Sequence, residues 1–185
     1  DYIRAPLKVL EKEGFEVTYV KVGEDGVVDP ADVEKALRKD TILVSVMYAN
    51  NEIGTIQPIS EIAEVVKKFR EKNGITAPLL HTDACQAAGY LDLSVEKLGI
   101  DFMTINAGKI YGPKGVGVLY IRKGIKLVPQ IYGGGQEFGI RAGTENVAGI
   151  VGLATALAFV QKEKEENNER LRIVRDKLID GVLQI

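Results

Sequence analysis

Residues 79–83, Leu-Leu-His-Thr-Asp, and residues 102–109, Phe-Met-Thr-Ile-Asn-Ala-Gly-Lys, decide the fold of this chain. Each segment opens with a short apolar run, which predicts a buried strand. Asp83 closes the first run, and Lys109 follows the second after a small-residue loop. If the two strands are parallel neighbours, Asp83 and Lys109 leave the same carboxyl edge of the sheet, where open α/β sheets bind their ligands.

The sequence around these segments alternates between strand and helix patterns. The run 41–47 is almost continuously apolar, which is typical of a strand buried on both faces. The alternation predicts an α/β fold with a mainly parallel central sheet and flanking helices, in which the last two strands, joined by a hairpin, could run the other way. Strands are predicted at 15–20, 41–47, 79–83, 102–105, 116–121 and 126–131, and helices at 3–13, 30–37, 58–72, 95–98, 147–165 and 169–183.

Composition excludes several classes of function. The net charge of −2 gives no basic excess for direct nucleic-acid binding. Glycines interrupt the longest apolar run, near 147–160, so we expect no membrane span, and the first residues show no signal-peptide pattern. The single cysteine rules out an internal disulfide and predicts a reducing, cytoplasmic location, and the single histidine rules out most histidine-based metal sites.

A lysine and a carboxylate that face one crevice suit pyridoxal phosphate, because the lysine forms a Schiff base and the acid pairs with the pyridine nitrogen. A surface salt bridge between Asp83 and Lys109 is the alternative. Asn50 and Asn51 follow another predicted strand, although asparagine is also common in turns. Gln86 returns towards the site if Ala84 starts a helical turn, and faces solvent otherwise.

Two glycine-rich stretches, 108–117 and 133–144, offer backbone N–H groups that could bind a phosphate, and the second adds Arg141 and Thr144. The first stretch has neither of the spacings that are typical of nucleotide-binding loops. A tight turn and a subunit contact are the alternatives. We expect Cys85 to be a buried small hydrophobe and His81 to have a local hydrogen-bond partner.

Residues 81–86, 109–115, 133–137 and 141–146 together resemble the cysteine desulfurases, which are class V, fold-type-I pyridoxal phosphate enzymes, and residues 50–54 fit the same set. The resemblance covers nearly the whole chain. It implies the large cofactor-binding domain of a fold-type-I aminotransferase, with 1–146 as its central part and 147–185 as helices that lead towards a small C-terminal domain. Both ends fall within or beside predicted helices, so we expect a fragment that is truncated at both ends.

The resemblance also implies a role for each candidate residue. Lys109 would hold the cofactor as a Schiff base and later move protons, and Asp83 would pair with the pyridine nitrogen. Gln86 would bond the ring oxygen, and Asn51 would contact the cofactor nearby. The remaining cofactor-binding residues would be Asn106 and Gly108, which flank the phosphate, and Thr144, which reaches the cofactor of the other subunit of a homodimer.

The implied reaction converts L-cysteine to L-alanine and leaves the sulfur as a persulfide on an enzyme cysteine. A sulfur-acceptor protein of iron–sulfur cluster assembly or of tRNA thiolation would then receive it. The alternatives are a selenocysteine lyase, another class V lyase or aminotransferase, and a non-catalytic split subunit. A nucleotide-binding domain is disfavoured by the missing phosphate-loop spacings.

The chain departs from the family pattern in two respects. Asn106-Ala107-Gly108 stands where the family commonly has Ser-x-His, so the contact of that histidine is lost at Gly108. The family's phosphate loop and ring-stacking histidine are expected before residue 1, and its persulfide cysteine and substrate-binding arginine after residue 185. We therefore expect this segment alone not to turn over cysteine.

Overall fold

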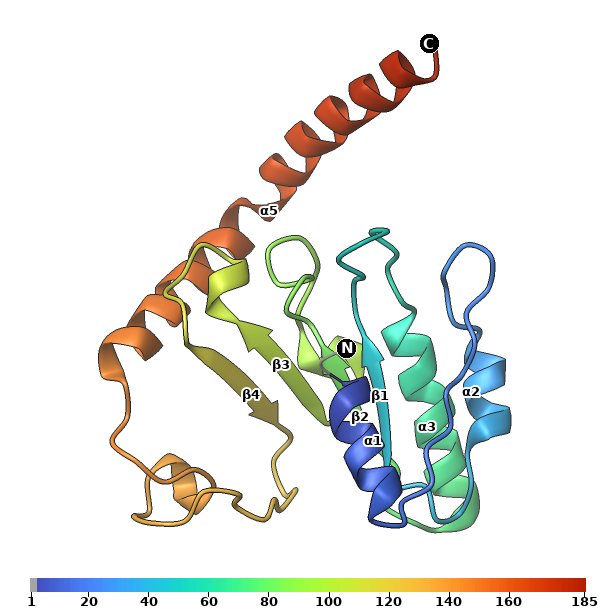
Figure 1. The fold of residues 1–185 in the computed structure, drawn as a ribbon, viewed down its shortest axis with the longest axis vertical. Helices are drawn as coiled ribbons and strands as arrows, with labels where there is room; N and C mark the ends of the chain where they lie inside the picture. The colour runs from blue at the N-terminus through green and yellow to red at the C-terminus, as the bar shows by residue number, and fades with distance from the viewer. Residues whose placement is uncertain (1–2) are drawn as a thin grey trace.

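The computed structural model describes residues 3–185, whose centre is a four-stranded sheet (Figure 1). The strands are β1 (Leu43–Met47), β2 (Leu79–Asp83), β3 (Phe102–Asn106) and β4 (Gly117–Ile121), and they lie in the order β1-β2-β3-β4. β1, β2 and β3 are parallel, and β4 is antiparallel to β3. The predicted α/β fold with a mainly parallel sheet is confirmed.

Helices begin and end where the sequence provides caps. The Asp29 side chain accepts a hydrogen bond from the Ala31 N–H (2.8 Å) at the start of α2, and Gly74 adopts the left-handed conformation that ends α3. The helices are α1 (Arg4–Lys12), α2 (Pro30–Ala36), α3 (Ile59–Asn73), α4 (Val95–Leu98) and α5 (Val147–Val182), with 3-10 turns η1 (Ala107–Lys109) and η2 (Glu137–Gly139).

The two faces of β2 have different surroundings. Leu80 and Thr82 are fully buried, and Leu80 belongs to the same core cluster as Ile62 and Val66 of α3. The alternate residues of the strand are only partly buried, and Asp83 is among them. Because side chains alternate along a strand, Asp83 lies on the less covered face of the sheet.

A buried carboxylate ties the amino ends of the strands together. Asp101 is 2% exposed, and its Oδ2 accepts hydrogen bonds from the Leu80 N–H (2.7 Å) and from the guanidinium of Arg70. The Nε of Arg122 lies 3.3 Å from Oδ1. A buried charge of this kind is tolerated because two cations and a backbone N–H compensate it.

Two predicted strands are absent, and a third is less buried than expected. Residues 15–20 and 126–131 form no strand, although Ile131 makes an isolated bridge to Arg141. β1 forms as predicted but lies at an edge of the sheet, where Leu43 is 46% exposed, so it is not buried on both faces. In each case the alternating or apolar pattern is present, but no neighbouring strand within residues 3–185 completes the pairing.

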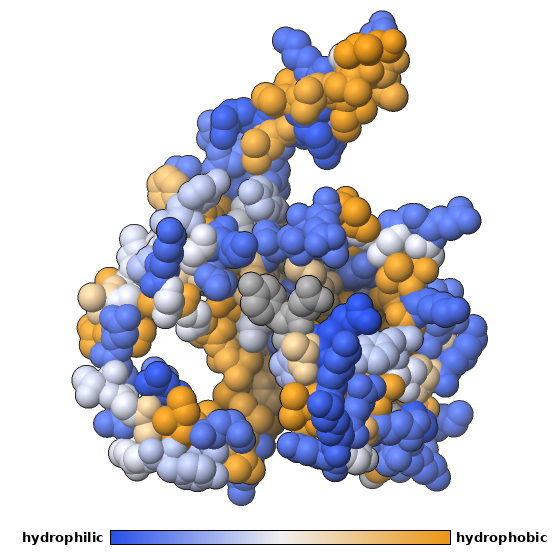
Figure 2. Space-filling view, viewed as in Figure 1, coloured by the Kyte–Doolittle hydropathy of each residue, from blue (hydrophilic) through white to orange (hydrophobic). Residues whose placement is uncertain are grey.

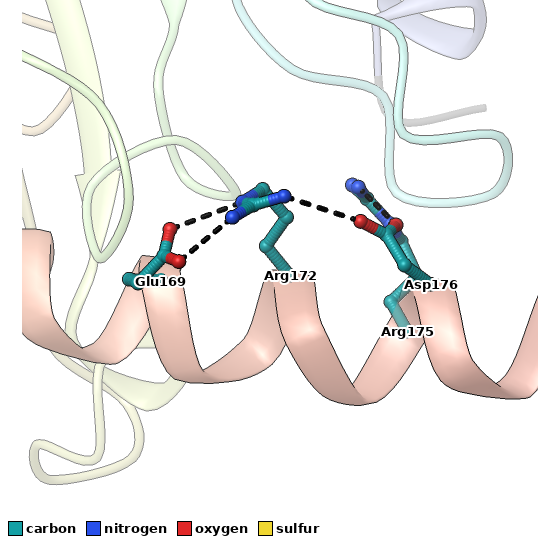
Figure 3. Close-up of polar contacts among 4 residues, drawn as sticks. All are labelled: Glu169, Arg172, Arg175 and Asp176. Atoms are coloured by element: carbon teal, nitrogen blue, oxygen red, sulfur yellow. Dashed lines mark hydrogen bonds and ion pairs between the residues drawn. The ribbon is translucent and has the colours of Figure 1, made fainter.

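The last two predicted helices are one continuous helix, α5. The stretch 165–169 is polar but contains neither glycine nor proline, so nothing in it breaks a helix. The distal half of α5 carries a ladder of ion pairs in which Arg172 contacts Glu169 (2.7 Å) and Asp176 (3.4 Å), and Arg175 also contacts Asp176 (Figure 3). The two pairs at spacings of three and four residues add a small stabilisation to this exposed helix.

The distal half of α5 projects away from the sheet, and its opposite side is apolar (Figure 2). Val174, Leu178 and Val182 are 58–67% exposed there. Within residues 3–185, none of the helices has the length and apolar character that a membrane crossing requires. The division at residue 147 stays a prediction, although α5 does begin at Val147.

Candidate active site

The carboxyl ends of the parallel strands form one edge, as the sequence predicts. In the register of the sheet, Met47 lies beside Asp83, and Asp83 lies beside Thr104. β3 continues for two more residues to Asn106, and η1 follows directly. The loops that carry Asn51, Asp83 and Lys109 therefore all leave the same edge of the sheet (Figure 1).

The short turn η1 presents Lys109. The Oδ1 atom of Asn106 accepts a hydrogen bond from the Gly108 N–H (2.8 Å) and thereby caps the turn. Ala107 and Ile110 are buried on either side, whereas Lys109 is exposed and forms no ion pair with any described residue. Lys109 therefore projects from a turn whose buried neighbours hold it in place, and no described ion pair occupies its amine.

Helix α5 supports this turn from outside. A Cβ atom on Gly152 would lie 3.0 Å from the ring of Pro113, and one on Gly112 would lie 3.2 Å from the Cβ of Ala156. The small residues at the start of α5 thus let the helix approach the turn after Lys109 closely. Substituents at these positions would displace the turn that carries the lysine.

The Cys85 thiol lies within the electrostatic reach of both charged candidates. The Oδ1 atom of Asp83 accepts a hydrogen bond from the Cys85 N–H (2.9 Å). Burial, followed by the hydrogen bond and negative charge of Asp83, raises the pKa of Cys85 to about 12, whereas the positive charge of Lys109 acts to lower it. The charges of Asp83 and Lys109 therefore both reach this sulfur, which places the two side chains in one neighbourhood.

A row of polar side chains braces the sheet next to Asp83. His81 Nδ1 lies 2.8 Å from the Ser45 Oγ, and its Nε2 lies 3.3 Å from the Thr104 Oγ1, so the row crosses three strands. Burial lowers the pKa of His81, and the nearby Asp83 charge opposes this effect. The expected local hydrogen-bond partner of His81 is confirmed. The lowered pKa favours a neutral imidazole, which can take part in both contacts of this row.

Gln86 and Asn51 lie near the same edge in different settings. The N–H groups of Ala87 and Ala88 both bond to the Ala84 C=O (3.0 and 2.9 Å), so Ala84 does start the helical turn that the placement of Gln86 requires. Asn50 has a purely local role, because its Oδ1 accepts the N–H groups of the next loop residues. Asn51 is exposed on that loop, and its side chain makes no hydrogen bond to residues 3–185.

The remaining phosphate-binding candidates are less directly supported. The Gly108 N–H is already bonded to the Asn106 side chain, so this N–H is not free to bind a phosphate, and the roles of both residues there stay a prediction. Thr144 is exposed in the connection between β4 and α5, which starts at the amino edge of β3, beside Phe102 (Figure 1). The structure does not bring Thr144 to Asp83, and its role at a second subunit's site stays a prediction.

Comparison with known sequences identifies the family. A profile of the family described as "Aminotransferase class-V" matches residues 3–185. The chain belongs to this family. It is 52% identical over 177 residues to "Cysteine desulfurase IscS" of Dictyoglomus turgidum, a match that covers 96% of this chain and 43% of that protein. The chain thus spans less than half the length of this relative.

Solved structures of this class V family agree with the fold. The structure of a "NIFS-LIKE PROTEIN" superposes with a TM-score of 0.89 at 46% identity, covering 96% of this chain and 47% of that one. "SspA in complex with cysteine" gives a TM-score of 0.76 at 40% identity, covering 84% of this chain and 44% of that one. The resemblance to cysteine desulfurases is therefore confirmed in sequence and in fold.

Two polar side chains next to the candidate site could not be singled out from the sequence. Ser45 and Thr104 hold His81 from both sides. The signal that could have revealed them is the strand period, since Ser45 and His81 occupy paired positions of β1 and β2 and polar residues at such positions meet on one face. The sequence of one strand alone does not show which residue of the next strand lies beside it.

Cys85 is expected to be an unreactive thiol. With a pKa of about 12 it stays protonated at neutral pH, and the thiolate is the form that reacts with alkylating agents. Iodoacetamide should modify the folded chain at pH 8 at least about 100-fold more slowly than it modifies the chain unfolded in urea. Mass spectrometry of timed samples measures both rates, and equal rates would contradict the described burial of this thiol.

Proposed function

We propose that the protein carrying this chain is a pyridoxal-phosphate-dependent cysteine desulfurase, with Lys109 as the residue that binds the cofactor covalently. The observation that carries the proposal is the placement of a carboxylate and an unpaired lysine amine after neighbouring parallel strands at one edge of the sheet, where the charges of both reach the Cys85 sulfur. This donor set fits the group: the amine suits its aldehyde and the carboxylate suits its ring nitrogen. The family match over residues 3–185 supports the same assignment.

Each side chain would have a separate task. Bound pyridoxal phosphate supplies an electron sink for the substrate's Cα. Asp83 would hold the proton on the ring nitrogen, and Gln86 would donate a hydrogen bond to the ring oxygen. Lys109 would accept the proton from the substrate's Cα, and the amide of Asn106 would bind the phosphate together with Asn51 nearby.

The sulfur has to leave for a cysteine outside these residues. Cys85 is the only cysteine of the chain, and its raised pKa keeps it a thiol at neutral pH. A thiolate is needed to attack the substrate sulfur. The 185-residue chain alone is therefore expected to form no alanine from cysteine.

We also propose a homodimer, a sulfur-acceptor protein as partner, and a cytoplasmic location. Large apolar side chains in the connection between β4 and α5 support the dimer, since Val128, Tyr132 and Phe138 are 73–98% exposed. Iron–sulfur assembly is the pathway that the names of the relatives favour. A single cysteine, with no internal disulfide possible, suits a reducing compartment.

The test of this proposal is substrate turnover by the intact protein. Supplied with pyridoxal phosphate and L-cysteine, it should form L-alanine and a protein-bound persulfide in equal amounts in a single turnover. L-selenocysteine in a parallel assay separates the desulfurase from a selenocysteine lyase. Turnover of selenocysteine without turnover of cysteine would overturn the proposed substrate, and turnover of neither would overturn the proposed activity.

A further inference from the structure

Helix α5 is bonded to the turn that carries Gln86. The side-chain amide of Gln161, on this helix, donates hydrogen bonds to the C=O groups of Ala88 (2.8 Å) and Leu91 (2.9 Å). Its oxygen, Oε1, accepts a hydrogen bond from the Lys164 Nζ (3.3 Å). A carbonyl oxygen can only accept, so the NH₂ group must face the turn, and both of its donors are in use.

The backbone from Ala84 to Leu91 forms one connected turn. The Ala88 N–H bonds to the Ala84 C=O (2.9 Å), and the Leu91 N–H bonds to the Ala87 C=O (2.8 Å). The three alanines are fully buried. No backbone N–H of the described chain bonds to the C=O groups of Ala88 and Leu91. Gln161 therefore satisfies acceptors at the end of the turn that the backbone leaves unpaired, which would be costly at the buried Ala88.

The same helix supports the turn that carries Lys109. Its small residues Gly152 and Ala156 allow the helix to approach that turn closely. The two turns also lie side by side, since a Cβ atom on Gly89 would lie 4.0 Å from the Cγ2 of Ile110, the residue after Lys109. One helix thus fixes two neighbouring turns that carry candidate cofactor contacts.

We propose that Gln161 is a positioning residue of the cofactor site, whose amide holds the turn where Gln86 can bond the ring oxygen of pyridoxal phosphate. The inference rests on the proposed function, which supplies the cofactor. Both N–H groups of Gln161 are taken up by C=O groups, so the residue acts through the turn and not on the cofactor itself. Without these donors the buried C=O of Ala88 is unpaired, and the turn shifts to find another donor and moves Gln86 with it.

The test uses the intact protein and two variants that remove the donors. Gln161→Glu keeps the side-chain volume and the oxygen that contacts Lys164, and Gln161→Met removes the donors without adding charge. Lys164→Ala is the matched control, because it removes the partner of the oxygen and leaves both bonds to the turn. Amide hydrogen exchange at Ala88 and Leu91 should become at least about fivefold faster in both Gln161 variants and change less than about twofold in the control.

The second measurement is the dissociation constant of pyridoxal phosphate, obtained from its absorption on binding. Gln86→Ala and either Gln161 variant should each weaken binding about three- to tenfold, the effect of one hydrogen bond. Because both substitutions remove the same contact with the ring oxygen, the double variant should bind within about twofold of Gln86→Ala alone. A residue that only stabilised the fold would instead give losses that multiply.

Multiplied losses in the double variant would therefore overturn the proposal. Unchanged exchange at Ala88 and Leu91 in both Gln161 variants would overturn it too, as would unchanged cofactor binding in those variants or an equal loss in Lys164→Ala. Failure of the proposed function gives a different result, because the unsubstituted protein then binds no pyridoxal phosphate. The exchange rates still show in that case whether Gln161 holds the turn.

Discussion

Replacing Lys109 by alanine is expected to lower kcat for alanine formation by the intact protein at least about 1,000-fold, because one side chain both fixes the cofactor and moves the proton at the substrate's Cα. The described structure gives Lys109 no ion pair, so the substitution should leave stability almost unchanged. Initial rates of alanine formation from L-cysteine measure the first effect, and thermal unfolding measures the second.

Lys114 provides the matched control for this substitution. It is an exposed lysine in the same turn, five positions further along the chain. Lys114→Ala should keep the activity within about threefold of the unsubstituted protein, since a surface side chain away from the reacting atoms contributes little. Equal losses from both substitutions would show that the turn as a whole, and not the Lys109 amine, is required.

Replacing Asp101 by alanine is expected to lower the free energy of unfolding by about 3–5 kcal/mol, the cost of removing one partner from a buried ion pair. The substitution leaves the Arg70 guanidinium, whose side chain is 18% exposed, without its carboxylate, and the Leu80 N–H without an acceptor. Urea unfolding of the 185-residue chain, followed by circular dichroism, measures the change.

Asp92 provides the control for burial. It pairs with Lys97 at 2.8 Å, but both side chains are exposed, so solvent screens the pair and it contributes little to stability. Asp92→Ala should therefore change the free energy of unfolding much less than Asp101→Ala does. If Asp101→Ala cost no more than Asp92→Ala, the network at the amino ends of the strands would not hold the sheet together.

The parts of the fold that the sequence predicts are those whose neighbours are present. β2 and α4 have the predicted bounds, because each carries its own local signals and packs against residues of the same chain. The segment 15–20 has an equally clear strand pattern but no strand to pair with in residues 3–185. A periodic pattern shows which side chains an element buries. It does not show whether a neighbouring strand is present to bond the backbone N–H and C=O groups, and a strand also needs that neighbour.

The continuity of α5 shows a different limit. The polar stretch near residue 167 resembles a loop in composition, yet exposed helices are polar, and only glycine or proline would have indicated a break. The ion-pair ladder at Glu169, Arg172 and Asp176 uses the helical spacing of three and four residues. The same residues could therefore have indicated that the helix continues.

For the site, topology was the strongest guide. The two strand ends predict that Asp83 and Lys109 lie at one edge of the sheet, and in the structure the charges of both reach the Cys85 thiol. The hydrogen bond from Gly108 to Asn106 was not foreseeable, because an asparagine can cap a turn or bind a ligand with the same atoms. Thr144 depends on a second subunit and remains a prediction.

The position of the covalently bound cofactor tests the central claim most directly. The intact protein is mixed with pyridoxal phosphate, reduced with borohydride, digested and analysed by mass spectrometry. The added mass should lie on Lys109, and its yield should fall at least about tenfold in Asp83→Ala, which removes the partner of the ring nitrogen. A label on Lys114, or on any other lysine in place of Lys109, would contradict the account.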